Sequence, residues 1–72
     1  MRTIQAYLFS KDVYTKRDVK HFLERNNIIP IKPMHITKNY YRVRILTPNY
    51  RKYEYRIGRL AFGLDCIFEF LK

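Results

Sequence analysis

The chain has little of what stabilises many small proteins. Among its 72 residues Cys66 is the only cysteine, so no disulfide can form within the chain. Its two histidines, His21 and His35, lack a ligand set in the surrounding sequence, so a structural metal is not expected. A chain of this length buries only about 60% of its unfolded surface, which leaves a thin core. Dense aromatic packing or self-association would have to supplement that core.

Motifs of enzyme chemistry are also missing. The chain has no glycine-rich phosphate loop, no His-x-Glu with paired cysteines, no nucleophile elbow and no pair of acids close in sequence. Cys66 follows Asp65, but a lone cysteine is far more often a small core residue than a nucleophile. We therefore predict a protein that is not an enzyme and uses no cofactor. A basic ribonuclease is the least implausible enzymatic alternative.

Long apolar runs are absent, and acidic residues are scarce. The start MRTIQAYLFSKD has too short an apolar run for a signal peptide or for the ~20 apolar residues of a spanning helix, so we expect an intracellular protein that does not contact a membrane. Fifteen Lys and Arg face six Asp and Glu, a net charge of +9. Because such an excess repels itself, it predicts a negatively charged partner, most often nucleic acid. Alternatively, the charge only keeps the protein soluble.

The first third of the chain predicts a strand followed by a helix. Residues 3–9 alternate in the manner of a strand. Thr15 with Asp18 three residues later is an acidic variant of the capping box and predicts a helix start, while Asn26 and Asn27 suit its end. The helix has one narrow apolar stripe that needs a sheet to lie on, formed by Val19, Phe22 and Leu23.

The remainder predicts further strands. Pro30 and Pro33 indicate an extended connection that leads into a strand around Met34–Thr37, with a tight turn at Lys38 and Asn39. Strands follow at 40–46, 53–57 and 66–71, the last two separated by a short reversal between Gly58 and Gly63. The predicted fold class is α+β in the order β-α-β-β-β: a single domain over residues 1–72 with one helix packed on one face of a mainly antiparallel sheet.

One helix can cover only one face of that sheet, so the opposite face must meet water or a partner. A register error of one residue would exchange the two faces of a strand. The predicted core side holds Ile4, Ala6, Leu8, Val19, Phe22, Leu23, Tyr41, Val43, Ile45, Tyr53, Tyr55, Ile57, Phe68 and Phe70. The predicted open face holds Tyr7, Tyr40, Arg42, Arg44, Glu54, Arg56 and Glu69, with Gln5 at its edge.

The open face is the predicted binding surface. Arginine forks grip phosphate oxygens and tyrosine rings stack on unpaired bases, which favours single-stranded nucleic acid or RNA. Alternatively, Arg42 and Arg44 pair with Glu54 and Glu69, worth a few tenths of a kcal/mol each and without further consequence. The excess of cations elsewhere favours binding. The predicted nucleic-acid-binding residues are Tyr7, Tyr40, Arg42, Arg44, Arg51, Lys52, Arg56 and Arg59.

Two other readings remain open. The basic residues Lys16, Arg17, Lys20 and Arg25 are interpreted as the solvated face of the helix, although they could sit on a phosphate backbone. The partner could instead be the acidic surface of a protein, which the chain would bind as an inhibitor or virion component with Tyr and Arg as anchors. Homodimerisation through the last strand or a sheet face fits either partner.

The whole-chain pattern resembles a group of short reading frames found in large DNA viruses and phages. The resemblance is carried by the start IQAYLFSKDVYTKRDVKHFLERN, the central NYYRVRI and the ending YRIGRLAFGLDCIFEF. It implies a viral or mobile-element origin, and hence the cytoplasm or nucleus of a host cell. No activity is established for that group, so the resemblance names no function.

Overall fold

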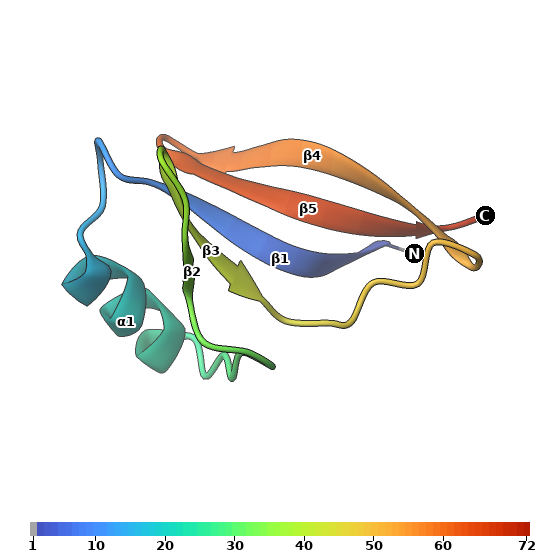
Figure 1. Cartoon of the computed structure of the whole chain (residues 1–72), viewed down its shortest axis with the longest axis horizontal. Coiled ribbons are helices and arrows are strands. Elements are labelled where there is room, and N and C mark those ends of the chain that lie inside the picture. Colours follow the sequence, from blue (N-terminus) through green and yellow to red (C-terminus); the bar gives the residue numbers. More distant parts are fainter. Residues whose placement is uncertain (1) are drawn as a thin grey trace.

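A computed structural model describes residues 2–72, which form a five-stranded sheet and one helix (Figure 1). All strand pairs are antiparallel, so the predicted α+β class is confirmed. The strand predicted around Met34–Thr37 is present as a short strand at His35–Ile36, so the sheet has five strands, whereas the predicted order β-α-β-β-β counts four. The elements are β1 (Arg2–Ser10), α1 (Lys16–Arg25), β2 (His35–Ile36), β3 (Tyr40–Arg44), β4 (Tyr53–Ala61) and β5 (Leu64–Leu71), with sheet order β2-β3-β1-β5-β4.

Both ends of α1 follow from local side-chain chemistry. The backbone N–H of Asp18 donates to Thr15 Oγ1 at 3.2 Å, and the backbone N–H of Thr15 donates to Asp18 Oδ2 at 2.9 Å. Each bond satisfies a donor that the first helical turn leaves without a partner. At the other end Asn27 adopts the left-handed conformation, with φ 54°. The predicted start and end of the helix are confirmed.

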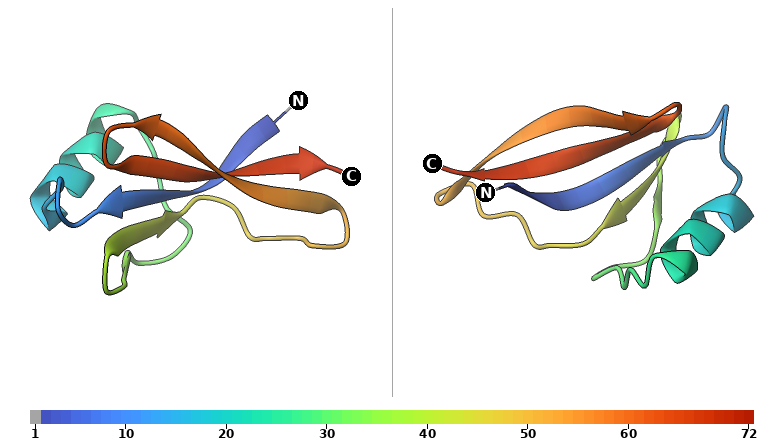
Figure 2. Two further views of the ribbon diagram at one scale, coloured as in Figure 1. Left: turned by 90° about the horizontal axis from the view of Figure 1, so that it is seen from above. Right: turned by 180° about the vertical axis from the view of Figure 1, so that it is seen from behind.

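The core lies where α1 packs on one end of the sheet. Val19 and Leu23 of α1 are buried with Phe9, Val43 and Leu64 of three different strands. Figures 1 and 2 show α1 beside only the end of the sheet at which β1 leads into the helix, away from the two chain termini. The thin core predicted from chain length is therefore concentrated at one end, and no helix covers the opposite face within residues 2–72.

A β-bulge in β1 overturns the predicted faces of that strand. The register between β1 and β5 shifts between Ile4 and Ala6, which makes Gln5 an extra residue. The bulge reverses the alternation, so Tyr7 packs with the core beneath α1, whereas Ala6 and Leu8 lie on the opposite face. The predictions that Tyr7 is on the open face and that Ala6 and Leu8 face the helix were wrong, although Ala6 is fully buried, as expected of a core residue.

The bulge residue, Gln5, was predicted to lie at the edge of the open face. It is buried instead. Gln5 is 2% exposed, and its Nε2 donates to the backbone carbonyl of Leu46 at 2.7 Å. The Gln5 carbonyl in turn accepts from the backbone N–H groups of Ile45 and Leu46. The extra residue therefore fastens β1 to the segment that follows β3.

The two faces of β4 are also the reverse of the prediction. Ile57 pairs with Ile67, which pairs with Ala6 on the open face, and the Ile57 side chain is 71% exposed. Alternation shows which residues of a strand share a face, but it does not show which face is turned toward the core. Strand β4 lies at the sheet edge and contributes no residue to the core cluster, so neither of its faces is marked by burial beneath α1. Tyr53 and Tyr55 therefore lie on the open face with Ile57, and Glu54 and Arg56 lie on the helix side.

Strand β4 is longer than predicted and forms one edge of the sheet. It continues through Gly58 to Ala61 instead of reversing at Gly58. Gly58 lies under the Phe68 ring, where a Cβ would come within 2.5 Å of Phe68 Cε2, so the glycine makes room for the ring. The last strand, β5, lies between β1 and β4, so both of its edges are paired within the sheet and neither is free to pair with a second copy.

Candidate nucleic-acid interface

Strand β3 presents its arginines on the uncovered face, as predicted. Val43 is fully buried beneath α1, so the residues on either side of it, Arg42 and Arg44, point the other way. Across the β1 ladder Arg42 lies opposite Leu8 and Arg44 lies opposite Ala6. Each arginine stem therefore has an apolar neighbour, a common arrangement in which the methylene groups cover apolar surface while the guanidinium reaches toward water.

The acids that could have neutralised these arginines are engaged elsewhere. Glu69 is 8% exposed and accepts hydrogen bonds from Thr3 Oγ1 at 3.1 Å and from the Tyr55 hydroxyl at 2.8 Å. Glu54 pairs with Arg56 across 3.4 Å on the other side of the sheet. Over residues 2–72 no ion pair involves Arg42 or Arg44. The alternative in which cross-strand acids account for these two cations is therefore wrong.

Both arginines also carry an unsatisfied donor. The Nε atoms of Arg42 and Arg44 are buried, and neither has a hydrogen-bond partner in the described part of the chain. A buried donor without a partner costs roughly 1–3 kcal/mol. Arginine forks are normally satisfied by carboxylate or phosphate oxygens, and no carboxylate in the described part of the chain pairs with these two. Their chemistry suits an external oxyanion.

A basic hollow borders β3 on the open face. It has a volume of about 310 Å³ and is lined by Lys32, Pro33, His35 and Arg44. His35 lies opposite Arg42 in the β2–β3 ladder. Neither Lys32 nor His35 was among the predicted binding residues, although the predicted turn at 38–39 would have set His35 opposite Arg42. We call Lys32, His35, Tyr40, Arg42 and Arg44 together the arginine face.

Tyr40 and Arg59 complete the predicted residues on this side of the sheet. Tyr40 lies opposite Ser10 at the end of the sheet, on the same face as Arg42. Arg59 of β4 lies opposite Asp65 of β5, in line with Leu8 and Arg42, and its Nε pairs with Asp65 Oδ1 at 3.3 Å. The Arg59 side chain remains 70% exposed. Within the part of the chain that the structure describes, only the Nε of this guanidinium donates to Asp65, so its other N–H groups remain available.

The other predicted residues lie away from the arginine face. Tyr7 packs edge-on against Phe22 of α1 with ring centroids 5.6 Å apart, and burial raises the pKa of its hydroxyl, with a smaller contribution from Cys66. Arg56 lies on the helix side with its guanidinium 5.8 Å from the Phe70 ring centroid. The remaining two, Arg51 and Lys52, are exposed in the β3–β4 connection at the end of the sheet far from α1 (Figure 1).

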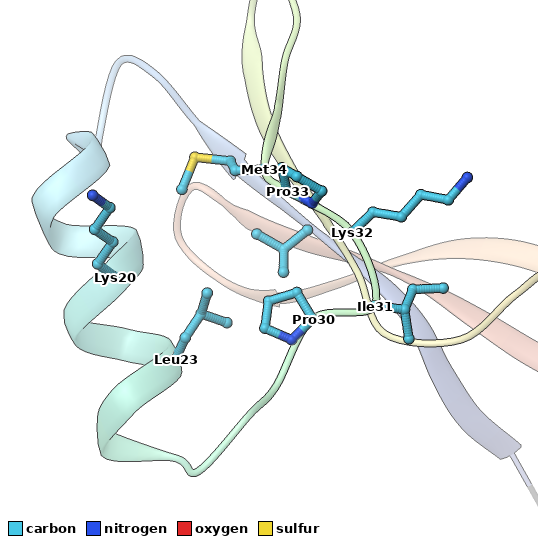
Figure 3. Close-up of a pocket in the computed structure, with 8 residues that line it drawn as sticks. Lys20, Leu23, Pro30, Ile31, Lys32, Pro33 and Met34 are labelled. Atoms are coloured by element: carbon cyan, nitrogen blue, oxygen red, sulfur yellow. The ribbon is translucent and has the colours of Figure 1, made fainter.

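A second hollow lies on the helix side of β3. It has a volume of about 420 Å³, lies between α1 and residues 30–34, and includes Val43. Figure 3 shows Leu23, Pro30 and Met34 directed toward it, whereas the Lys32 amine points away from it. Its lining is mostly apolar, and it lies on the other side of Val43 from the arginines. It is therefore separate from the arginine face.

Three further observations concern metal binding, membrane spans and similarity to known proteins. Within residues 2–72 no three His, Cys, Asp or Glu side chains gather in a way that could hold a metal ion. None of the described helical structure is long and apolar enough to cross a bilayer. No protein family, curated protein or solved structure matches this chain, so the site is interpreted from its own residues.

Proposed function

We propose that this chain is a non-enzymatic protein that binds single-stranded nucleic acid through the arginine face. The observation that carries the proposal is the pair Arg42 and Arg44, which lie on an uncovered sheet face, lack acid partners and hold buried unsatisfied Nε atoms. Arginine guanidinium groups donate bidentate hydrogen bonds to phosphate oxygens.

The surroundings favour a single strand over a duplex. Tyr40 continues the row of Arg42 and Arg44 along β3 and offers a ring on which an unpaired base can stack. The surface is a sheet face, not a projecting helix or ribbon that could enter a groove. Lys32 at the hollow adds positive charge beside the same strand, and His35 adds ring nitrogens. The net charge of +9 attracts a polyanion over a longer range.

The test compares two matched pairs of substitutions. Binding of fluorescent single- and double-stranded oligonucleotides would be followed by anisotropy over a series of salt concentrations. Arg42→Ala with Arg44→Ala should lower single-strand affinity by about tenfold or more, because two charge-assisted contacts are lost. Since each phosphate contact on a single strand contributes about 0.7 to the slope of log affinity against log salt, that slope should flatten by about 1.4.

The control pair is Lys16→Ala with Lys20→Ala on the exposed side of α1. It removes the same charge, yet it should change affinity only by the smaller long-range electrostatic effect. The proposal is refuted if wild-type protein fails to bind single strands at low salt. Equal losses from the two pairs would show that net charge alone, and not the arginine face, holds the ligand.

A protein partner is the second candidate, and one observation favours it. On the edge strand β4 Ile57 is 71% exposed and Leu60 44%, and Phe62 in the turn that follows is 80% exposed. Exposed apolar side chains beside a free strand edge mark protein interaction sites more often than phosphate contacts. A viral or mobile-element accessory protein could bind an acidic partner in this way. Recovery of one stoichiometric protein after nuclease treatment, with no oligonucleotide binding, would favour this candidate over the first.

A further inference from the structure

A third hollow lies at the end of the arginine face. It has a volume of about 200 Å³, and Tyr40 forms part of its wall, so it begins where the row of Arg42 and Arg44 ends. The end of β1 lies between the β2–β3 and β4–β5 turns, as Figure 2 shows. Backbone bonds from Ser10 N–H to the Gly63 carbonyl at 2.8 Å and from Lys11 N–H to the Asn39 carbonyl at 3.0 Å hold these three segments together.

An exposed aromatic ring contributes to the wall of this hollow. Phe62 is 80% exposed. The next residue, Gly63, has φ 73°, so it is the glycine that provides the left-handed conformation of the turn. Nothing in the turn requires a large apolar side chain at the Phe62 position, where polar residues are usual. Tyr40 and Phe62 therefore give the hollow two aromatic side chains, which are the groups on which unpaired bases stack.

Carboxylates supply the polar part of the hollow. Asp65 is held in place by Arg59, which donates to its Oδ1 at 3.3 Å, and the Asp65 side chain is 18% exposed. No hydrogen bond to the other oxygen, Oδ2, occurs within residues 2–72. Asp12 and Ser10 also line the hollow, and the Ser10 oxygen accepts the backbone N–H of Asp12 at 3.3 Å. The hollow thus combines rings, a fixed carboxylate and a guanidinium.

We propose that this hollow, lined by Tyr40, Phe62 and Asp65, is a nucleobase pocket that selects bases carrying an exocyclic amino group. A carboxylate accepts the N4 amino protons of cytosine, and it accepts the corresponding N–H groups of adenine or guanine. Uracil and thymine present a carbonyl oxygen where cytosine has its amino group, so a carboxylate placed to accept the N4 protons would face an oxygen. The only donor on that edge of uracil or thymine is N3–H, one ring position away. This inference rests on the proposed function, since the base arrives on a strand held by the arginine face.

The placement along β3 is compatible with one strand using both sites. Two residues along an extended strand advance about 7 Å at the usual 3.4 Å per residue. Arg42 therefore lies about that far from Tyr40, so a phosphate at Arg42 and a base beside Tyr40 belong to neighbouring parts of one nucleic-acid strand. The pocket adds selectivity for the base, while the arginines supply affinity that is indifferent to sequence.

Oligonucleotides of dC and dU test the pocket, because these bases differ only along one ring edge: cytosine has an amino group at position 4 and an acceptor at N3, whereas uracil has a carbonyl oxygen at position 4 and a proton on N3. Wild-type protein should bind oligo(dC) about tenfold more tightly than oligo(dU) at equal length and salt. Asp65→Asn should bring that ratio close to one, because an amide can serve either base. Glu24→Gln on the exposed side of α1 makes the same charge change and should leave the ratio as it is in the wild type.

A second variant keeps the test decisive if Asp65→Asn misfolds. Phe62→Ala, at an exposed turn position, should weaken binding to both oligonucleotides severalfold and leave binding to an abasic strand unchanged. Tight binding with equal affinity for dC and dU would overturn the pocket and leave the proposed function standing. Failure to bind any strand at low salt would refute both together.

Discussion

Replacing Arg42 and Arg44 with methionine should make the protein more stable while weakening nucleic-acid binding. Each arginine holds a buried Nε without a hydrogen-bond partner, and each stem lies opposite an apolar side chain, Leu8 or Ala6. Methionine keeps a long unbranched stem over the same neighbours and removes the unsatisfied donor. Residues that serve a ligand at the expense of stability are expected at binding sites.

The magnitude follows from the burial of these atoms. An unsatisfied buried donor costs roughly 1–3 kcal/mol, and the lower end applies because both side chains are only half-buried. We expect each substitution to raise the free energy of unfolding by about 1 kcal/mol. For a domain of this size that corresponds to a rise in Tm of about 4–8 °C. The single variants and the double variant should be measured, because the two sites are close enough to couple.

Denaturant titration and calorimetry, followed in parallel, provide the assay. Part of any gain could come from relief of charge repulsion, so the titrations would be repeated at about 1 M salt, where the Debye length is about 3 Å. Lys16→Met and Lys20→Met are matched controls on the exposed helix surface and should change stability by less than about 0.5 kcal/mol. A loss of stability on Arg→Met substitution, or a gain that vanishes at high salt, would refute the reasoning.

Two further predictions concern the frame of the sheet. Gly63→Ala should destabilise the protein by about 2 kcal/mol, because Gly63 has φ 73° and an added Cβ would come within 2.6 Å of Val13 Cγ2 and 2.7 Å of Val13 Cβ. In a denaturation series Val13→Ala should restore only part of this loss, because it removes the contact with Cγ2 but leaves the contact with Cβ and the backbone strain; full restoration would contradict the strain. The pKa of the Tyr55 hydroxyl is raised above 10.0, chiefly by desolvation and further by its bond to Glu69, against a lowering contribution from the backbone of Asn49. Because the pKa of Tyr55 is higher in the folded state than in the unfolded state, the neutral hydroxyl contributes stability that is complete below pH 10.0 and is lost as pH rises through the folded-state pKa. Tyr55→Phe should therefore flatten the fall in the free energy of unfolding at alkaline pH. An unchanged fall at alkaline pH would argue against this contribution.

Local patterns were enough to predict the ends of the helix and the faces of β3. The Thr15–Asp18 capping box and the left-handed Asn27 depend on contacts within one helical turn, and both are present. Alternation in β3 correctly placed Arg42 and Arg44 together on the uncovered face because the strand has no bulge. Such features are determined by neighbours in sequence, which is why a pattern reveals them.

Long-range pairing decided what the patterns could not reveal. The bulge at Gln5 depends on how β1 pairs with β5 at the far end of the chain, and it moved Tyr7 from the predicted site into the core. The hollow beside β3 includes Lys32 because the connection folds back along that strand, where the Ile31 N–H donates to the Arg44 carbonyl at 3.0 Å. The predicted binding residues therefore separated into several locations.

The amino-acid sequence by itself determined the net charge of +9, the impossibility of an internal disulfide and the strand that carries two arginines on one side. Only the tertiary structure decided that those arginines remain without acid partners. Glu69 is instead engaged by Thr3, 66 positions away in sequence, and by Tyr55. Which partner an acid finds depends on the register of distant strands, and a single-residue shift moves a side chain to the other face.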